Sequence, residues 1–286
     1  MSLRLAPLLF FALACATTRN MTVDYDTKPT PDLQSKLESI DATIRERYGM
    51  TADQTDVGLI DLRHGTIAMI HPDKIEYAAS VAKVGILYAY FKLHGNEPLD
   101  AQTRHELGLM IKVSSNEMAA KYSRQIGLQQ IQQILNDDGF YDASHGGGIW
   151  VGKHYGVGTE RYGDPIANHS HAVTVRQLLR FYLLLEERKL ISPKASKTMR
   201  EIFESPDIPH DNVKFVKGLE GRNVRIIRKL GTWENWLHDS EVVTGRGRHY
   251  ILVGLTTHPK GDEYLSELAR AVDDLMVASL AHGPII

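Results

Sequence analysis

The stretch that decides the fold is YAASVAKVGILYAYF, residues 77–91. From Val84 onward its side chains are apolar on every face of a helix, which predicts a buried helix over residues 77–93. A lysine inside such a helix loses much of its hydration, and desolvation favours its neutral form. Ser80 precedes Lys83 by three residues, so the two side chains share one helix face and touch. A serine beside a lysine of lowered pKa is a pair suited to nucleophilic acyl transfer.

The position of Ser80 adds to this interpretation, although the short pattern has an alternative. Ser80 stands where the predicted helix begins, so unpaired backbone N–H groups lie beside it and can stabilise an oxyanion. In the alternative, Ser80 only caps the helix and the amine of Lys83 extends to solvent.

Two later segments carry polar residues that could belong to a catalytic site. Taken alone, each can also be explained as a common structural feature. Val113-Ser114-Ser115-Asn116 is typical of a loop or a helix cap. Residues 228–232, RKLGT, are typical of a strand that ends in solvated charge. Gly231 would nevertheless let a ligand backbone lie against that strand, and Lys229 offers a positive charge there.

The composition is that of a globular protein of one or two domains. The chain has 286 residues, of which 43% are hydrophobic and 24% are charged. Its net charge of −2 provides no overall attraction to nucleic acid. The single cysteine, Cys15, excludes an intrachain disulfide and a cysteine-based zinc site.

The N-terminus has the pattern of an export signal. Arg4 is followed by an apolar run over residues 5–16, which at about 12 residues is too short to span a bilayer. We expect residues 1–16 to be a signal peptide and residues 17–30 a polar tether. Leu13-Ala14-Cys15 also resembles a bacterial lipobox, so the expected location is periplasmic or extracellular, with a lipid anchor on Cys15 as the alternative.

The order of predicted elements indicates one sheet and an inserted lobe. A helix begins at Pro31 and ends near Gly49, and a capping box at Thr174-x-x-Gln177 starts another helix. Further helices are expected at 104–112, 115–125, 128–135 and 262–281, and strands at 57–62, 66–71, 224–230, 241–244 and 249–257. Strands from both ends can form one antiparallel sheet covered by the terminal helices. An all-helical lobe of about residues 80–212 is then inserted, with a cleft where the lobes meet.

Taken together, S-x-x-K at Ser80, S-x-N at Ser114 and K-x-G at Lys229 resemble, in that order, the penicillin-recognising serine hydrolases, which include the class A β-lactamases. The flanks YAASVAKV (77–84) and MIKVSSNEMA (110–119) also resemble that family. The resemblance covers residues 31–281. It implies a single catalytic domain with the α/β (α+β sandwich) fold of the β-lactamases and transpeptidases.

The resemblance also implies roles for individual residues. Ser80 would be the acylated nucleophile and Lys83 the base that takes its proton. Ser114 would relay a proton to the leaving nitrogen, while Lys229 would hold Ser114 and attract a substrate carboxylate. The expected substrate-binding residues are Asn116, Gly231 and Thr232, with an oxyanion hole at the backbone N–H groups of Ser80 and Thr232.

The chain departs from the family pattern at four points. Ser115 replaces the aspartate of S-D-N, and Leu230 replaces the hydroxyl residue of K-[TS]-G. The stretch between Lys83 and Ser114 is short for a class A enzyme. Residues 137–171, a long Gly- and His-rich loop, contain no E-x-x-L-N, the motif whose glutamate activates the deacylating water in class A enzymes.

Other residues of this loop are candidates for the missing base. Glu160 is its only glutamate, and Asp164, His169 and His171 are further candidates, each of which could instead stabilise the loop. His169 and His171 also suggest a metal pair, which lacks a third ligand.

Three functions fit these observations. The first is a serine β-lactamase-type hydrolase that acts on β-lactam or related amide bonds through a Ser80 acyl-enzyme. The second is a cell-wall D,D-peptidase, esterase or amidase on the same fold, which the loss of E-x-x-L-N and Leu230 favour. The third is a non-catalytic binding lipoprotein. We expect a monomer that binds a small-molecule or peptidoglycan-like substrate, does not bind nucleic acid and needs no cofactor, because serine and lysine suffice for acyl transfer.

Overall fold

The computed structural model describes residues 21–156, 158 and 160–278. The predicted signal peptide and the lipobox at Cys15 lie outside these residues. Within the described ranges, no helix is long and apolar enough to cross a membrane.

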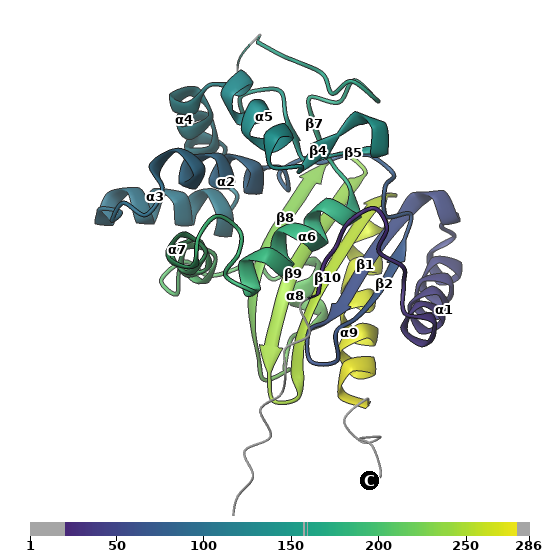
Figure 1. The fold of residues 1–286 in the computed structure, drawn as a ribbon. Coiled ribbons are helices and arrows are strands. Elements are labelled where there is room, and N and C mark those ends of the chain that lie inside the picture. The colour runs from purple at the N-terminus through teal and green to yellow at the C-terminus, as the bar shows by residue number, and fades with distance from the viewer. Residues whose placement is uncertain (1–20, 157, 159, 279–286) are drawn as a thin grey trace, which may run out of the picture.

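An antiparallel five-stranded sheet forms the centre of the molecule, with strand order β2-β1-β10-β9-β8 (Figure 1). It joins both ends of the chain, because β1 pairs with β10 from Thr55 opposite Thr256 to Asp61 opposite Tyr250. The strands are β1 (Thr55–Asp61), β2 (Thr66–Ile70), β8 (Val224–Trp233), β9 (Trp236–Gly245) and β10 (Arg248–Thr257). The predicted single sheet is confirmed, and β8, which carries Lys229, is one of its two edges.

Helices cover both faces of this sheet. The terminal helices α1 (Pro31–Tyr48) and α9 (Gly261–Ala278) pack on one face, and α6 (Val175–Glu186) packs on the other. Side chains of β10 alternate accordingly: Leu252 joins the core under α1 and α9, whereas Val253 joins the core under α6. Gly58 in β1 permits the close approach of α6, since a Cβ there would lie 2.5 Å from a methyl carbon of Val175.

A second lobe lies between β3 (Glu76–Tyr77) and β8 in the sequence, and helices dominate it. Its helices are α2 (Lys83–His94), α3 (Ala101–Lys112), α4 (Asn116–Ile126), α5 (Leu128–Asp137) and α7 (Pro193–Glu204). The sequence predicts an all-helical lobe, and this prediction is wrong. Short strands lie within residues 141–173: β4 (Tyr141–Asp142), β5 (Gly147–Gly148), β6 (Trp150–Val151) and β7 (His171–Val173). A short helix, α8 (Lys214–Gly218), then leads into β8, and single 3₁₀ turns occur at η1 (Ala52–Gln54) and η2 (Ala143–His145).

The structure differs from the sequence-based expectation in two further places. The buried helix begins at Lys83, not at residue 77, because Glu76–Tyr77 pairs as a strand with β7. The expected polar tether is packed against the domain over residues 21–30. Val23 is 4% exposed, and the side-chain amide of Gln177 donates a hydrogen bond of 2.9 Å to the hydroxyl of Tyr25.

Candidate active site

Ser80 lies in a tight turn between β3 and α2. Ala79, just before it, has a φ of 46°, a left-handed conformation that non-glycine residues seldom adopt. The hydroxyl of Tyr155 donates a hydrogen bond of 2.8 Å to the carbonyl of Ala79 and holds this residue in place. The backbone N–H of Lys83 donates to the carbonyl of Ser80 at 3.3 Å, so the serine and the lysine are separated by one turn.

The backbone N–H of Ser80 is available to a ligand. Among the described residues, no carbonyl accepts a hydrogen bond from it. Ser80 itself is half-buried, whereas its neighbours Ala79 and Val81 are buried. Of these three residues, only Ser80 is therefore accessible to a ligand, and its backbone N–H is free to donate.

The amine of Lys83 is buried and surrounded by uncharged oxygen atoms. Its Nζ lies 2.5 Å from the carbonyl oxygen of Ser114, 3.1 Å from Ser114 Oγ and 2.8 Å from Asn116 Oδ1. The ring centroid of Tyr155 is 4.5 Å away. Within the described part of the chain, no carboxylate forms an ion pair with Lys83. Burial lowers the pKa of Lys83 to about 7, so a large fraction of this amine is neutral at neutral pH.

Ser114 connects Lys83 to Lys229. Ser114 has a φ of 58° and lies in the bend between α3 and α4. Its Oγ is 2.9 Å from Nζ of Lys229, which also donates to the carbonyl of Leu230 at 2.8 Å. Ser115, the residue that replaces an aspartate, caps α4 by accepting a hydrogen bond from the backbone N–H of Met118. Ser115 thus serves as a helix cap and carries no charge.

Lys229 is fully buried on β8. Burial, and next the charge of Lys83, hold the pKa of Lys229 well below its usual range. Two lysines in one dry site favour a state in which they do not both carry a proton. The hydroxyl of Ser114, which can donate and accept, lies between them and can pass a proton from one amine to the other.

Gly231 places β8 directly against the turn of Ser80. A Cβ at this position would lie 2.8 Å from the carbonyl oxygen of Ala78 and 3.1 Å from the backbone nitrogen of Val81. Both contacts are to backbone, so a side chain here would push the strand away from the turn. The glycine thus sets the distance between Ser80 and the next residue on the strand, Thr232.

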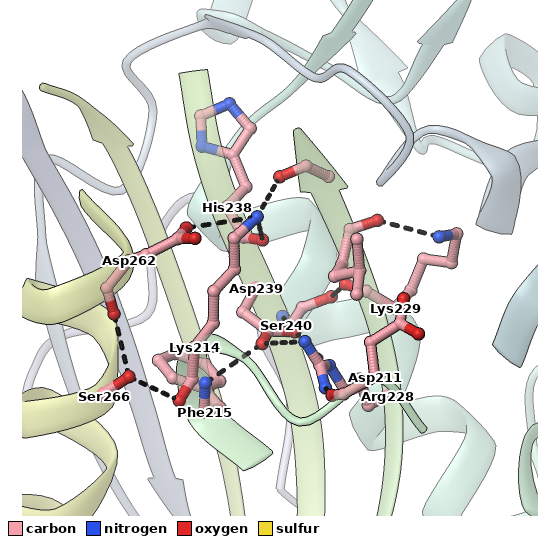
Figure 2. A network of polar contacts seen from close by, with 12 residues as sticks. Asp211, Lys214, Phe215, Arg228, Lys229, His238, Asp239, Ser240, Asp262 and Ser266 are labelled. Atoms are coloured by element: carbon pink, nitrogen blue, oxygen red, sulfur yellow. Dashed lines mark hydrogen bonds and ion pairs between the residues drawn. The ribbon is translucent and has the colours of Figure 1, made fainter. Parts of the chain in front are cut away.

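Lys214 is a site residue that the sequence analysis missed. Its Nζ is 2.6 Å from the carbonyl of Gly231 and 2.6 Å from Thr232 Oγ1. It is also 3.3 Å from the carbonyl of His238 (Figure 2). The carboxylate of Asp262 is 3.8 Å away, and burial lowers the pKa of Lys214 to about 8. This lysine therefore orients the hydroxyl of Thr232 and places a cation beneath the end of β8.

A buried ion pair beneath Lys229 fixes the segment that carries Lys214. Arg228 contacts Asp239 on the neighbouring strand, and the Asp239 carboxylate accepts a hydrogen bond of 3.2 Å from the backbone N–H of Phe215 (Figure 2). Lys214, the residue before Phe215, has a φ of 53°. The pair thus holds an unusual backbone conformation at the residue whose amine reaches Thr232.

The two acidic candidates of the long loop have their partners within the loop. Glu160 is exposed, and its carboxylate contacts the hydroxyl of Tyr162 at 3.0 Å and a ring nitrogen of His154 at 3.4 Å. Asp164 is buried and accepts hydrogen bonds from the backbone N–H groups of Ile166, Ala167 and His169, so it stabilises the loop.

The two histidines of the loop, His169 and His171, also make contacts that stabilise the structure. Nε2 of His171 lies 2.9 Å from the carbonyl of Lys153, and burial lowers the pKa of His171 to about 4. The ring of His169 packs edge-on against Tyr77. In residues 21–156, 158 and 160–278, no group of three or more His, Cys, Asp or Glu side chains is placed to hold a metal ion.

The structure therefore brings together Lys83, Ser114, Asn116 and Lys229 through direct hydrogen bonds. Ser80 stands one turn before Lys83, and the three contacts of the lysine amine are to Ser114 and Asn116 rather than to the hydroxyl of Ser80. Of the missed residues, Tyr155 comes from an irregular segment and Lys214 is the first residue of the short helix α8.

Comparison with known proteins gives one family and one fold. A family model described as the β-lactamase enzyme family matches residues 100–276, a range that includes Ser114 and Lys229 but begins after Ser80. No curated protein matches the chain by sequence.

Several solved structures share the fold at low sequence identity. A β-lactamase from Sphaerobacter thermophilus DSM 20745 is 14% identical, with a TM-score of 0.67 over 85% of this chain and 97% of that one. A class A β-lactamase from Mycobacterium abscessus is 14% identical, with a TM-score of 0.65 over 84% and 98%. A variant of PBP-A, solved as an acyl-enzyme complex with penicillin G, is 16% identical, with a TM-score of 0.64 over 90% and 98%.

Proposed function

The chain belongs to the β-lactamase enzyme family, and from this premise we propose that it is a serine β-lactamase-type hydrolase that attacks β-lactam or related amide bonds through an acyl-enzyme on Ser80. The observation that carries the proposal is the environment of Lys83. This buried amine, with a pKa lowered to about 7, stands one turn from Ser80, and its hydrogen bonds within the described residues are to neutral oxygen atoms. An amine in that state is a base of suitable strength at neutral pH.

The proposed acylation step uses the groups of the site in turn. Neutral Lys83 takes the proton of the Ser80 hydroxyl while Oγ attacks the amide carbonyl carbon. The oxyanion that forms accepts a hydrogen bond from the free backbone N–H of Ser80, and one such donor is typically worth ~3 kcal/mol. The C–N bond then breaks, and the nitrogen takes the proton of the Ser114 hydroxyl. Lys83, 3.1 Å from that hydroxyl, returns a proton to Ser114 and becomes neutral again.

The end of β8 provides the expected substrate-binding surface. Asn116 holds the amine of Lys83 and presents a side-chain amide to the site. Thr232, whose hydroxyl is oriented by Lys214, stands where the family pattern places a second oxyanion donor and a contact to a substrate carboxylate. This hydroxyl partly replaces the one that Leu230 lacks.

A second function, that of a D,D-peptidase, esterase or amidase, is favoured by one specific observation. The loop of residues 137–171 places no carboxylate against Lys83 among the described residues, and its two acidic candidates are engaged elsewhere. General base catalysis is worth ~10²–10⁴-fold, so an enzyme without a base for water would release a penicillin slowly. Its natural acyl acceptor would then be a substrate amine or a substrate-bound water.

A time course of intact mass after mixing with benzylpenicillin tests both functions. A transient adduct with release of opened penicillin supports the β-lactamase. A lasting adduct supports the peptidase or esterase, and the absence of any adduct contradicts acyl transfer to a β-lactam.

A further inference from the structure

A cavity of about 410 Å³ opens beside Tyr77, the last residue of β3, and is not used by the acylation step. Aromatic and basic side chains from three segments form much of its wall: the β3 region, the long loop and the β8–β9 hairpin. The residues that matter for its chemistry are Tyr77, Lys153, Arg161, Trp233, Glu234 and Trp236.

The chain geometry places this cavity within reach of an acyl group on Ser80. Tyr77 precedes Ser80 by three residues, so their Cα atoms are at most about 11 Å apart. Side chains alternate along a strand, so Trp233 lies on the same face of β8 as Lys229 and Gly231. That face contacts Ser114 and the Ser80 turn. The tryptophan thus continues the row of residues along which a substrate would lie.

The aromatic wall offers a flat platform. The rings of Tyr77 and Trp236 meet edge-on with centroids 5.5 Å apart. Trp233 leaves 56% of its surface exposed, which is unusual for a large aromatic side chain without a partner. A planar group that entered the cavity would bury this surface.

The basic side chains of the wall carry charge that the described residues do not neutralise. Arg161 donates hydrogen bonds to the side-chain and backbone oxygens of Asn168, which are uncharged. Within the described part of the chain, neither Lys153 nor Arg161 forms an ion pair with a carboxylate. Glu234, the acidic residue of the wall, faces Tyr77, whose pKa is raised by burial and by this carboxylate. The cavity therefore has two cations and one anion.

We propose that this cavity receives the acyl side chain of the substrate and selects a planar group that bears a carboxylate. The planar part would stack against Trp233, and the carboxylate would lie between Lys153 and Arg161. The inference rests on the proposed acylation of Ser80, and it adds the chemical class of the acyl donor.

Three penicillins that share one nucleus test this selection. Carbenicillin carries a phenyl ring with a carboxylate on the side chain, benzylpenicillin has the ring alone, and ampicillin has the ring with an amine. We expect second-order acylation rate constants, measured by intact mass, to fall in that order, by about two- to fivefold for each change of charge. The difference should shrink in 1 M NaCl, where the screening length is about 3 Å.

Variants separate the two parts of the cavity. A Lys153→Gln/Arg161→Gln double variant should lose this advantage: it should acylate with carbenicillin about two- to fivefold more slowly and keep its rate with benzylpenicillin nearly unchanged. Trp233→Ala should slow all three penicillins by about three- to tenfold. Lys197→Gln, which removes an exposed charge on α7, is the matched control and should preserve the order.

Two outcomes overturn the proposal separately from the proposed function. Equal rates for the three penicillins, or an order that the double variant keeps, would show that the cavity does not select a carboxylate. If no penicillin acylates the protein, the proposed function fails, and binding of phenylacetate against its neutral amide, phenylacetamide, followed by tryptophan fluorescence, tests the cavity alone. Tighter binding of phenylacetate that Lys153→Gln/Arg161→Gln abolishes would support it, and equal binding would contradict it.

Discussion

Lys83 and Lys229 converge on one hydroxyl, that of Ser114, whose Oγ lies 3.1 Å from the first amine and 2.9 Å from the second. Both amines are buried, and burial lowers the pKa of each. A protonated pair would place two positive charges in a dry pocket, so the arrangement favours one neutral amine. In the proposed mechanism the neutral amine accepts the proton of Ser80, and the shared hydroxyl is the path by which that proton can leave.

Acylation should therefore depend on pH with a definite sign. Burial lowers the pKa of Lys83 to about 7, and only the deprotonated amine can accept the proton of Ser80. The acylation rate constant should fall about tenfold per pH unit below 7 and level off above it. Measurement with benzylpenicillin from pH 5 to pH 9 checks this. A rate that stays flat or falls over that range would contradict the role of a neutral lysine.

Replacement of the same lysine tests its role directly. Lys83→Met keeps an unbranched apolar chain in α2 and removes the base, so acylation should slow by at least ~10²-fold. Lys197→Met, an exposed position on α7, is the control for loss of a lysine. Near-normal acylation by Lys83→Met, with an unchanged circular dichroism spectrum, would assign the base elsewhere.

Gly231→Ala should harm catalysis through backbone position. The new Cβ would lie 2.8 Å from the carbonyl oxygen of Ala78, so β8 must move away from the turn of Ser80. A displacement near 1 Å can cost about 10²-fold in rate. Gly158→Ala, where nothing lies within 4 Å of the added carbon, should leave the rate unchanged. Comparable acylation by the two variants would show that the contact at Gly231 does not position the strand.

Lys214 and Thr232 should act as a pair. The amine of Lys214 is 2.6 Å from the hydroxyl of Thr232, so either loss leaves the other group without its partner. Lys214→Met and Thr232→Val should each lower kcat/KM, and the double variant should lose less than the product of the two effects. A coupling free energy of about 0.5–3 kcal/mol is the range for groups in contact. If the effects of the two substitutions on kcat/KM were strictly additive in free energy, Lys214 would not act through Thr232.

Much of this arrangement could be predicted from the sequence because its signals are local. The cap of α1 by Gly49, which has a φ of 66°, and the cap of α6 by Thr174 follow the expected rules. The spacing of S-x-x-K predicts a separation of one turn, and the backbone hydrogen bond from Lys83 to the carbonyl of Ser80 agrees with it. The helix α7 starts at Ser192-Pro193, a signal of the same kind that the sequence analysis did not use.

The parts that were missed depend on contacts between distant residues. Tyr155 supports Ala79 across 76 positions, and Lys214 reaches Thr232 from the first residue of the short helix α8, where its own φ is left-handed. Neither residue belongs to a periodic pattern. The two-residue strand β3 exists only because β7 pairs with it, which is why the start of α2 was placed too early. Residues 21–30 pack against the domain through a few buried side chains such as Val23. The polar composition of this segment gives no sign of that packing.

Glu160 offers a test of deacylation. Its carboxylate contacts Tyr162 and His154 at the surface, so Glu160→Gln should leave the release of the acyl group within about twofold of the unchanged protein. Intact mass followed after removal of excess benzylpenicillin measures this release. A drop of the size that general base catalysis provides, ~10²-fold or more, would identify Glu160 as the base for water.

The central claim is that Ser80 is acylated, and one measurement tests it most directly. The unchanged protein and Ser80→Ala are each incubated with benzylpenicillin, quenched in acid, digested with a protease and mapped by mass spectrometry. The account predicts one penicilloyl adduct on the peptide that contains Ser80, and none on Ser80→Ala. An adduct that persists in Ser80→Ala, or that maps to another residue, would contradict the account.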